Sequence, residues 1–214
     1  MTRITVLGGT GYAGAAIAQE AAARGHEVTA VARRATEQQA DGPRYVSGDA
    51  TDGTFLKELA QQTDVLILAL APRGDMEGKV LEVAQTLIPI ALETGIRIGV
   101  IGGAGSLKVA EDGPRLIDTD RFPEEFKPEA FELISVWEKL QGSDDSLDWF
   151  YVSPAAGFGA YNPGERKGTY RLGGDVLLSD EAGNSDLSAE DLAIAVVDGI
   201  EKPQHRRTRF AVAY

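Results

Sequence analysis

Three glycines near the amino end of the chain have the spacing of a phosphate-binding turn. Gly8, Gly11 and Gly14 follow an apolar run with strand character and precede a helical pattern that reaches Arg24. In such a turn the first glycine permits a tight bend, the second lets a ligand approach the backbone, and the third lets helix and strand pack closely. Free N–H groups at the helix start attract phosphate oxygens.

This turn predicts a dinucleotide site, with a glycine turn that only shapes the chain as the alternative. The strand before the glycines and the helix after them favour the dinucleotide. The residues of the turn that we expect to bind it are Gly8, Thr10, Gly11, Tyr12, Ala13 and Gly14.

The end of the next predicted strand, residues 27–32, bears on which dinucleotide binds. Sites for NAD place an Asp or Glu about 20 residues after the glycines to hold the ribose 2′-hydroxyl. Here Arg33 and Arg34 follow the strand, and no acid does. Guanidinium groups suit a 2′-phosphate, and one can also stack on the adenine. We therefore expect NADP in preference to NAD, with a solvated pair of arginines as the alternative.

Composition limits the class of protein. The 214 residues suffice for one sizeable α/β domain, and the absence of cysteine excludes disulfides, thiolate metal sites and a cysteine nucleophile. No His, Asp or Glu spacing indicates a metal site. A net charge of −12 argues against nucleic acid as a partner. Without an apolar run of about 18 residues or a signal segment, we expect a cytoplasmic protein with no membrane contact, as a monomer or homodimer.

Strands and helices alternate through the first two thirds of the chain. This order predicts a Rossmann-type α/β fold, a doubly wound parallel sheet with helices on both faces. We expect one NAD(P)-binding domain over residues 1–214, with a small carboxyl-terminal elaboration on the substrate side, the insertion 154–186. Pro89 should kink or break the helix predicted over 76–93. Gly173-Gly174 indicates a hairpin, and Ser188 to Asp191 resembles a helix start.

Ligands of doubly wound sheets bind beyond the carboxyl ends of the strands. These ends supply the remaining predicted cofactor residues: Asp49 and Ala50 beside the adenine, Leu70 and Ala71 along the cofactor backbone, and Gly102, Gly103 and Pro154 beside the nicotinamide. The stretch from Ser106 to Pro128 has little periodicity and predicts a lid over the nicotinamide. A rigid loop packed through Leu116, Ile117 and Phe122 is the alternative.

Four segments, residues 8–14, 48–52, 102–107 and 148–154, resemble the atypical short-chain dehydrogenase/reductases. The nearest branch is the group named NADH-flavin reductases, which is similar to biliverdin reductase B and to NmrA-like proteins. Segments 163–166, 170–175 and 188–193 match the same branch. The resemblance covers nearly the whole chain and implies an NAD(P)H-dependent reductase.

One departure from this family bears on mechanism. Typical members carry a Tyr, and a Lys four residues later, on the helix before the strand predicted at 147–153. Residues 129–139 contain no tyrosine, and the distance to that strand places Phe131 and Ser135 near those positions. Lys139 is interpreted as a solvated helix residue. Carbonyl reduction by the usual pair is therefore not expected.

Hydride transfer to a flavin requires stacked rings more than a strong acid. We therefore expect reduction of a flavin or a quinone-like planar acceptor. The resemblance makes Ser106 the candidate catalytic residue, with a turn-capping serine as the alternative. Phe158 and Tyr161 could stack on the acceptor or only cover the end of the sheet. A non-catalytic, NmrA-like redox sensor that acts through a protein partner is the competing function, and an isomerase or epimerase is a third.

Overall fold

A single sheet of eight strands, in the order β3-β2-β1-β4-β5-β6-β8-β7, organises the molecule. The computed structural model describes residues 1–34 and 42–214. Every neighbouring pair is parallel except β7 with β8. The strands are β1 (Arg3–Leu7), β2 (Glu27–Ala32), β3 (Arg44–Ser47), β4 (Val65–Leu68), β5 (Arg97–Ile101), β6 (Trp149–Pro154), β7 (Arg171–Gly173) and β8 (Thr208–Ala213). The predicted doubly wound fold is confirmed.

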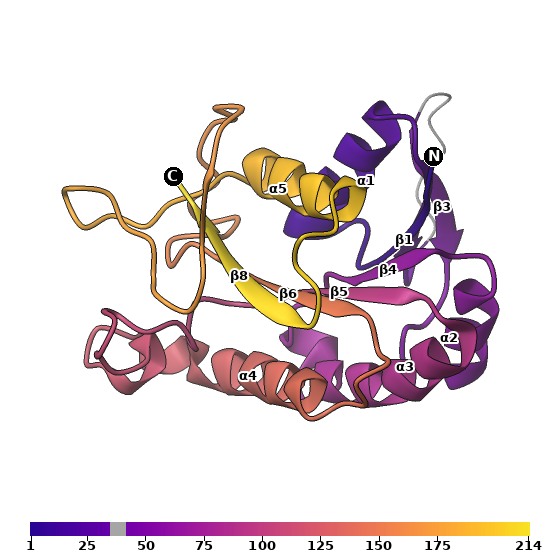
Figure 1. Ribbon diagram of the computed structural model, residues 1–214, viewed down its shortest axis with the longest axis horizontal. Helices are drawn as coiled ribbons and strands as arrows, with labels where there is room; N and C mark the ends of the chain where they lie inside the picture. The colour runs from indigo at the N-terminus through magenta and orange to yellow at the C-terminus, as the bar shows by residue number, and fades with distance from the viewer. Residues whose placement is uncertain (35–41) are drawn as a thin grey trace.

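Helices cover both faces of this sheet (Figure 1). Helices α1 (Tyr12–Ala23) and α5 (Ala189–Glu201) lie on one face, and α2 (Gly53–Ala60), α3 (Val80–Thr94) and α4 (Lys127–Gln141) lie on the other. Each face has its own apolar core. Successive residues of β6 alternate between the two cores, Phe150 toward α1 and α5 and Tyr151 toward α3 and α4. This period of two is what a strand buried on both faces requires.

The helix break predicted as one outcome at Pro89 and the hairpin predicted at Gly173-Gly174 are both absent from the described residues. Pro89 does not break α3, which continues to Thr94 before Gly95 ends it in a left-handed conformation. Pro89 lies on the exposed face of that helix, where water can satisfy the carbonyl that loses its partner. Gly173-Gly174 does not form a hairpin. Instead, β7 runs antiparallel to β8 at the sheet edge, a pairing between segments distant in sequence.

The longest helices of the described residues, α3 and α4, have 15 residues each, and none of the helices there has the length and apolar character of a membrane crossing.

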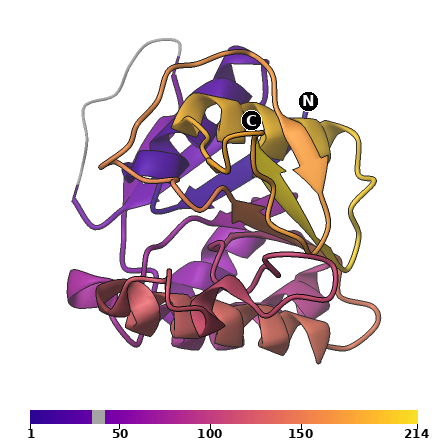
Figure 2. The same cartoon turned by 90° about the vertical axis from the view of Figure 1, so that its left-hand side faces the viewer.

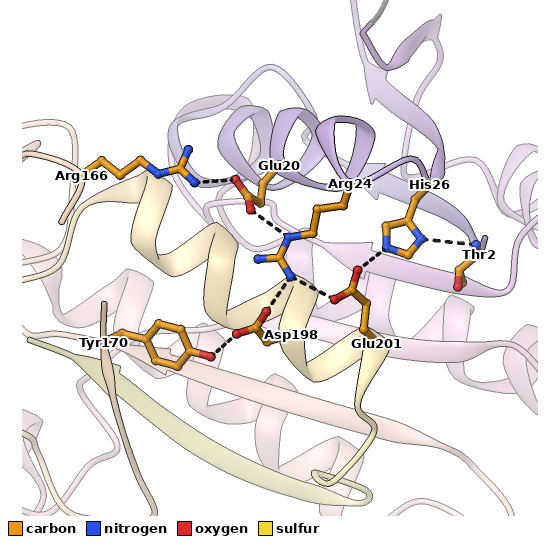
Figure 3. Close-up of polar contacts among 8 residues, drawn as sticks. All are labelled: Thr2, Glu20, Arg24, His26, Arg166, Tyr170, Asp198 and Glu201. Atoms are coloured by element: carbon orange, nitrogen blue, oxygen red, sulfur yellow. Dashed lines mark hydrogen bonds and ion pairs between the residues drawn. The ribbon is translucent and has the colours of Figure 1, made fainter. Parts of the chain in front are cut away.

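Arg24 joins the two helices of one face through three carboxylates (Figure 3). Arg24 caps the carboxyl end of α1, and its guanidinium donates to Glu20 of that helix at 2.8 Å and to Asp198 and Glu201 of α5 at 2.5 and 3.0 Å. His26 extends this network, because its Nε2 lies 3.0 Å from Glu201. The ends of α1 and α5 are thereby fixed to each other.

The segment between β6 and α5 is attached to the same network. Arg166 contacts Glu20 at 3.2 Å, and the Tyr170 hydroxyl donates to Asp198 at 2.5 Å (Figure 3). Burial, and then the bond to Asp198, raise the pKa of Tyr170 to about 12. These contacts hold a long loop segment against the helical layer.

Asp191 is a second attachment point for that segment. The predicted helix start is confirmed, because the Ser188 hydroxyl accepts from the Asp191 N–H. The Asp191 carboxylate accepts from the N–H groups of Lys167 and Gly168 and from the hydroxyl of Tyr214, and its residue is fully buried. Burial alone would raise the pKa of Asp191, but these hydrogen bonds outweigh burial and lower it.

We predict that Asp191→Asn lowers the free energy of unfolding by about 2 kcal/mol or more, because an amide replaces a carboxylate that accepts charge-assisted bonds. Urea unfolding at neutral pH measures the loss. Since the folded-state pKa is depressed, the stabilisation from Asp191 is present above the pKa of the unfolded chain and disappears as the pH falls through the folded-state value. The difference between variant and parent should therefore shrink in acid.

The matched control is Glu190→Gln, which removes an exposed carboxylate from the same helical turn. It should cost less than about 1 kcal/mol, the size of a helix-dipole interaction. Equal losses in the two variants would show that the buried hydrogen bonds of Asp191 are not the cause.

Candidate functional site

A cavity of about 870 Å³ lies beyond the carboxyl ends of β1, β4, β5 and β6. Its size suits a small-molecule site. Residues of the segment after β5 and of the segment after β6 line it. Figure 2 shows the first of these segments on the side of the sheet that carries α4 and the second on the side that carries α5. The cavity is therefore formed where a doubly wound sheet ordinarily binds its ligand.

The glycine turn forms one wall, and sterics require its glycines. Gly8 has a φ of +80°, and a Cβ there would lie 2.5 Å from the carbonyl oxygen of Ala69. A Cβ at Gly14 would lie 2.2 Å from the Gly8 carbonyl oxygen. Gly9, which the sequence analysis did not single out, is also constrained, because its Cβ would lie 2.7 Å from that of Ala30.

The start of α1 is suited to a phosphate. Gly11 is its N-cap residue and makes no side-chain capping bond, and the first turn contains no acidic residue. The first N–H groups of the helix thus have neither a capping side chain nor a nearby carboxylate, which leaves them available to phosphate oxygens. These residues fit a bound dinucleotide.

Most of the predicted site residues line this one cavity. Those that do are Gly8, Thr10, Gly11, Tyr12, Ala13, Arg33, Asp49, Ala50, Leu70, Ala71, Gly102, Gly103, Pro154, Phe158 and Tyr161. Gly14, Arg34 and Ser106 are not among the lining residues. Gly14 lies beneath the turn, where it packs against Gly8.

Arg33 lies at the end of β2 and meets an acid from another loop. Its guanidinium donates to Asp75 at 2.6 Å, and both side chains are more than half exposed. Asp75 belongs to the short 3₁₀ helix η1 (Gly74–Met76). The hydrogen bond and charge of Arg33 lower the pKa of Asp75. An exposed pair of this kind is weak, so Arg33 can exchange this carboxylate for another anion.

Asp49 is held by its own turn. One carboxylate oxygen accepts from the N–H and the hydroxyl of Thr51, at 2.9 and 2.8 Å, and these bonds lower the pKa of Asp49. The acid therefore stays ionised and fixed at the cavity wall.

Two aromatic pairs join separate segments of the cavity wall. Tyr12 and Phe158 have ring centroids 5.2 Å apart. Phe126 and Tyr161 are stacked, with centroids 6.3 Å apart and planes 16° from parallel, and the Tyr161 residue is 66% exposed. Phe126 precedes α4 and Tyr161 follows β6, so the second pair connects the two bordering segments.

Ser106 has a different place from the one predicted. Its residue is only 3% exposed, and its hydroxyl accepts from Arg209 at 2.7 Å. Arg209 also donates to Asp175 and lies over the ring of Trp137, 4.0 Å from the centroid. This geometry favours the alternative, in which the serine supports the loop, because a buried guanidinium needs acceptors. The catalytic assignment of Ser106 is not retained.

The register of α4 also differs from the expectation. Phe131 is half exposed, and the Ser135 hydroxyl donates to the Phe131 carbonyl within the helix. The residues of α4 that face the cavity are Glu129, Ala130 and Leu133. Phe131 and Ser135 thus do not take the positions of the family's Tyr and Lys. This register depends on the conformation of the loops that flank the helix, which the sequence pattern does not determine.

Four charged residues of the cavity were missed by the sequence analysis, namely Arg73, Arg121, Glu129 and Asp186. Arg73 donates to Glu129 at 2.9 Å. Of these residues, only Glu129 could have been found from the sequence. It stands four residues before the apolar Leu133, so the two share one face of the predicted helix. Within the described residues, no group of three His, Cys, Asp or Glu is arranged to hold a metal ion.

The segment after Ser106 is well packed. Leu107 and Ile117 are buried, and the backbone of Lys108 forms isolated β-bridges with that of Arg115 and of Val176. Phe122 packs against a small cluster that includes Ile117. These contacts favour the rigid loop over the predicted lid, although the segment does line the cavity.

The sequence matches the model of the NAD(P)H-binding family over residues 8–203. It is also 37% identical to the uncharacterized protein YwnB of Bacillus subtilis (strain 168) over 212 residues, which are 98% of this chain and 97% of YwnB.

Three solved structures share the fold over the whole of this chain. A protein of Burkholderia pseudomallei, provisionally named as exported, is 39% identical with a TM-score of 0.86 and complete coverage of both chains. A provisionally named epimerase of Bacteroides thetaiotaomicron is 33% identical with a TM-score of 0.88, covering 97% of that chain. SP1627 of Streptococcus pneumoniae TIGR4, provisionally named an NADH-flavin reductase, is 33% identical with a TM-score of 0.84, covering 99% of that chain. These names differ, so the shared fold alone does not identify a reaction.

We predict that Ser106→Ala lowers stability by about 1–2 kcal/mol, because Arg209 loses one buried acceptor, and leaves turnover of any substrate within about threefold of the parent. Thermal unfolding and steady-state kinetics measure the two quantities. A hundredfold loss of turnover in a variant as stable as the parent would restore the catalytic assignment.

Proposed function

The chain belongs to the NAD(P)H-binding family, among the atypical short-chain dehydrogenase/reductases, and from this we propose that it is an NADPH-dependent oxidoreductase that reduces a flavin or a quinone-like planar acceptor by direct hydride transfer. One observation carries the proposal. The cavity has a phosphate-binding turn on one wall and exposed, stacked aromatic rings on another, while α4 lacks the tyrosine that carbonyl reduction would use. The name given to SP1627 supports a flavin acceptor.

In this proposal the chain mainly binds and orients. The reduced nicotinamide, when bound, supplies a hydride. The N–H groups at the start of α1 hold the phosphates, and Gly102, Gly103 and Pro154 border the space for the nicotinamide. Phe126, Phe158 and Tyr161 offer rings against which a flat acceptor can stack.

The cavity phenols fit chemistry that needs no protein acid. Burial raises the pKa of Tyr12 and of Tyr161. Each is therefore a weaker acid than an unperturbed tyrosine, the reverse of what a neighbouring lysine achieves in the family's usual pair. Reduction of an oxidised flavin can take its proton from water, whereas reduction of an aldehyde or ketone ordinarily requires a donor beside the carbonyl oxygen.

We predict that NADPH is oxidised in the presence of FMN, riboflavin or a simple quinone, and not in the presence of aliphatic aldehydes or ketones. Absorbance at the NADPH band measures the rate, with protein lacking an acceptor as the control. Tight NADPH binding without turnover of any planar acceptor would contradict the proposal. If NADP⁺ and NADPH then differed in affinity, the redox-sensor function would be favoured.

We further propose that NADPH is preferred over NADH, because Arg33 lines the cavity at the end of β2, where an acid would bind the ribose of NADH. Arg33→Gln should weaken NADPH binding by about 10- to 100-fold, the loss of one charged hydrogen bond, and leave NADH binding nearly unchanged. Titration calorimetry measures both.

Arg3→Gln is the matched control. Arg3 is also an exposed arginine paired with an aspartate, but it lies at the amino end of β1, away from the cavity. It should alter neither affinity. Equal weakening of NADPH binding and NADH binding by Arg33→Gln would mean that Arg33 only supports the fold.

We also propose that the protein acts in the cytoplasm, where NADPH is available, as a monomer or homodimer with a small-molecule substrate.

A further inference from the structure

The charged side chains that line the cavity differ in whether they have partners. Six are present: Arg33, Asp49, Arg73, Arg121, Glu129 and Asp186. Arg33 pairs with Asp75, and Arg73 pairs with Glu129. Asp49 accepts from Thr51, and Asp186 accepts from Asn162 at 2.8 Å. Arg121 alone makes no hydrogen bond or ion pair to any residue in the described ranges 1–34 and 42–214.

The backbone that carries Arg121 is fixed. The next residue, Phe122, packs against Ile117 and Ala130, and its N–H donates to the Thr119 carbonyl at 3.2 Å. Arg121 thus projects from an ordered part of the loop and not from a free end. It shares this wall with Phe126, whose ring stacks on Tyr161.

The position of Arg121 separates it from the phosphates of the cofactor. The glycine turn and Arg33 belong to the β1 and β2 side of the sheet, whereas Arg121 lies between β5 and α4 in the chain and lines the cavity with Glu129 and Ala130 of α4. In the doubly wound arrangement this is the nicotinamide and acceptor side. The acids that face the same space, Glu129 and Asp186, already have partners.

We propose that Arg121 binds an anionic group, a phosphate or carboxylate, attached to the planar acceptor whose ring stacks near Phe126 and Tyr161. This inference rests on the proposed function and narrows its substrate class. A guanidinium can bind such a group with two parallel hydrogen bonds. The chain carries a net charge of −12, which repels anions in general, so an exposed, unpaired arginine at the cavity wall creates a local preference for them.

The experiment compares FMN with riboflavin, which have the same ring system and differ by one phosphate. Quenching of flavin fluorescence by the NADP⁺-loaded protein measures each Kd without requiring turnover. The parent should bind FMN about tenfold more tightly than riboflavin, and added salt should weaken only FMN. Arg121→Gln should raise the Kd for FMN about tenfold and leave that for riboflavin unchanged, and Arg121→Lys should fall between.

Arg115→Gln is the matched control. Arg115 lies in the same loop and is half exposed, but it pairs with Asp118 and does not line the cavity. This variant has the same change in net charge and should bind both flavins as the parent does. Thermal unfolding of each variant verifies that the fold is retained.

Equal affinities of the parent for FMN and riboflavin would overturn the inference, as would an equal effect of Arg121→Gln on both, or failure of both flavins to bind. The outcome for the proposed function is separate. Turnover of riboflavin without any preference for FMN would keep the reductase and remove the role of Arg121. Preferential FMN binding without NADPH oxidation would keep Arg121 and remove the reductase.

Discussion

The close contact between the glycine turn and the end of β4 is the constraint on which the site depends. Gly8 bends the chain in a conformation that other residues rarely adopt, and neither Gly8 nor Gly14 has room for a single methyl group. This closeness places the start of α1 directly over the end of the sheet. The unsatisfied N–H groups of the helix then point into the space that the carboxyl ends of the central strands border. A cavity elsewhere on this sheet would lack that fixed source of positive potential.

Electrostatics organise the remaining walls. The chain is strongly acidic, and most of its arginines act as attachment points between segments: Arg24 joins α1 to α5, Arg166 holds the segment after β6, and Arg209 joins β8 to Asp175 and Ser106. These contacts give two long loop segments defined positions without adding them to the sheet. The aromatic pairs across the cavity are consequences of that anchoring, because each ring lies on a backbone that is fixed elsewhere.

The part of the cavity wall that α4 contributes fits the hydride transfer proposed above. The α4 residues that reach the cavity are an acid paired with Arg73 and two apolar residues. Such a wall can exclude water and orient a flat molecule, and hydride transfer between stacked rings needs little beyond that. Under the proposal for Arg121, the neighbouring loop adds recognition of charge to recognition of shape.

The sequence by itself determined the features that depend on neighbouring residues. The strand, the three glycines and the helix that follows are contiguous, so their geometry is dictated locally, and the parallel, doubly wound character of the sheet follows from the alternation of elements. Ser188 likewise begins α5 through a bond only three residues long. Positions that depend on distant segments were decided only by the tertiary structure. Ser106 is buried because Arg209, 103 residues away, requires an acceptor, and β7 pairs with β8 and forms no hairpin. The register of α4 and the placement of Arg73 and Arg121 at the cavity wall depend on how loops pack, because loop conformation depends on long-range contacts that no periodicity in the sequence reveals.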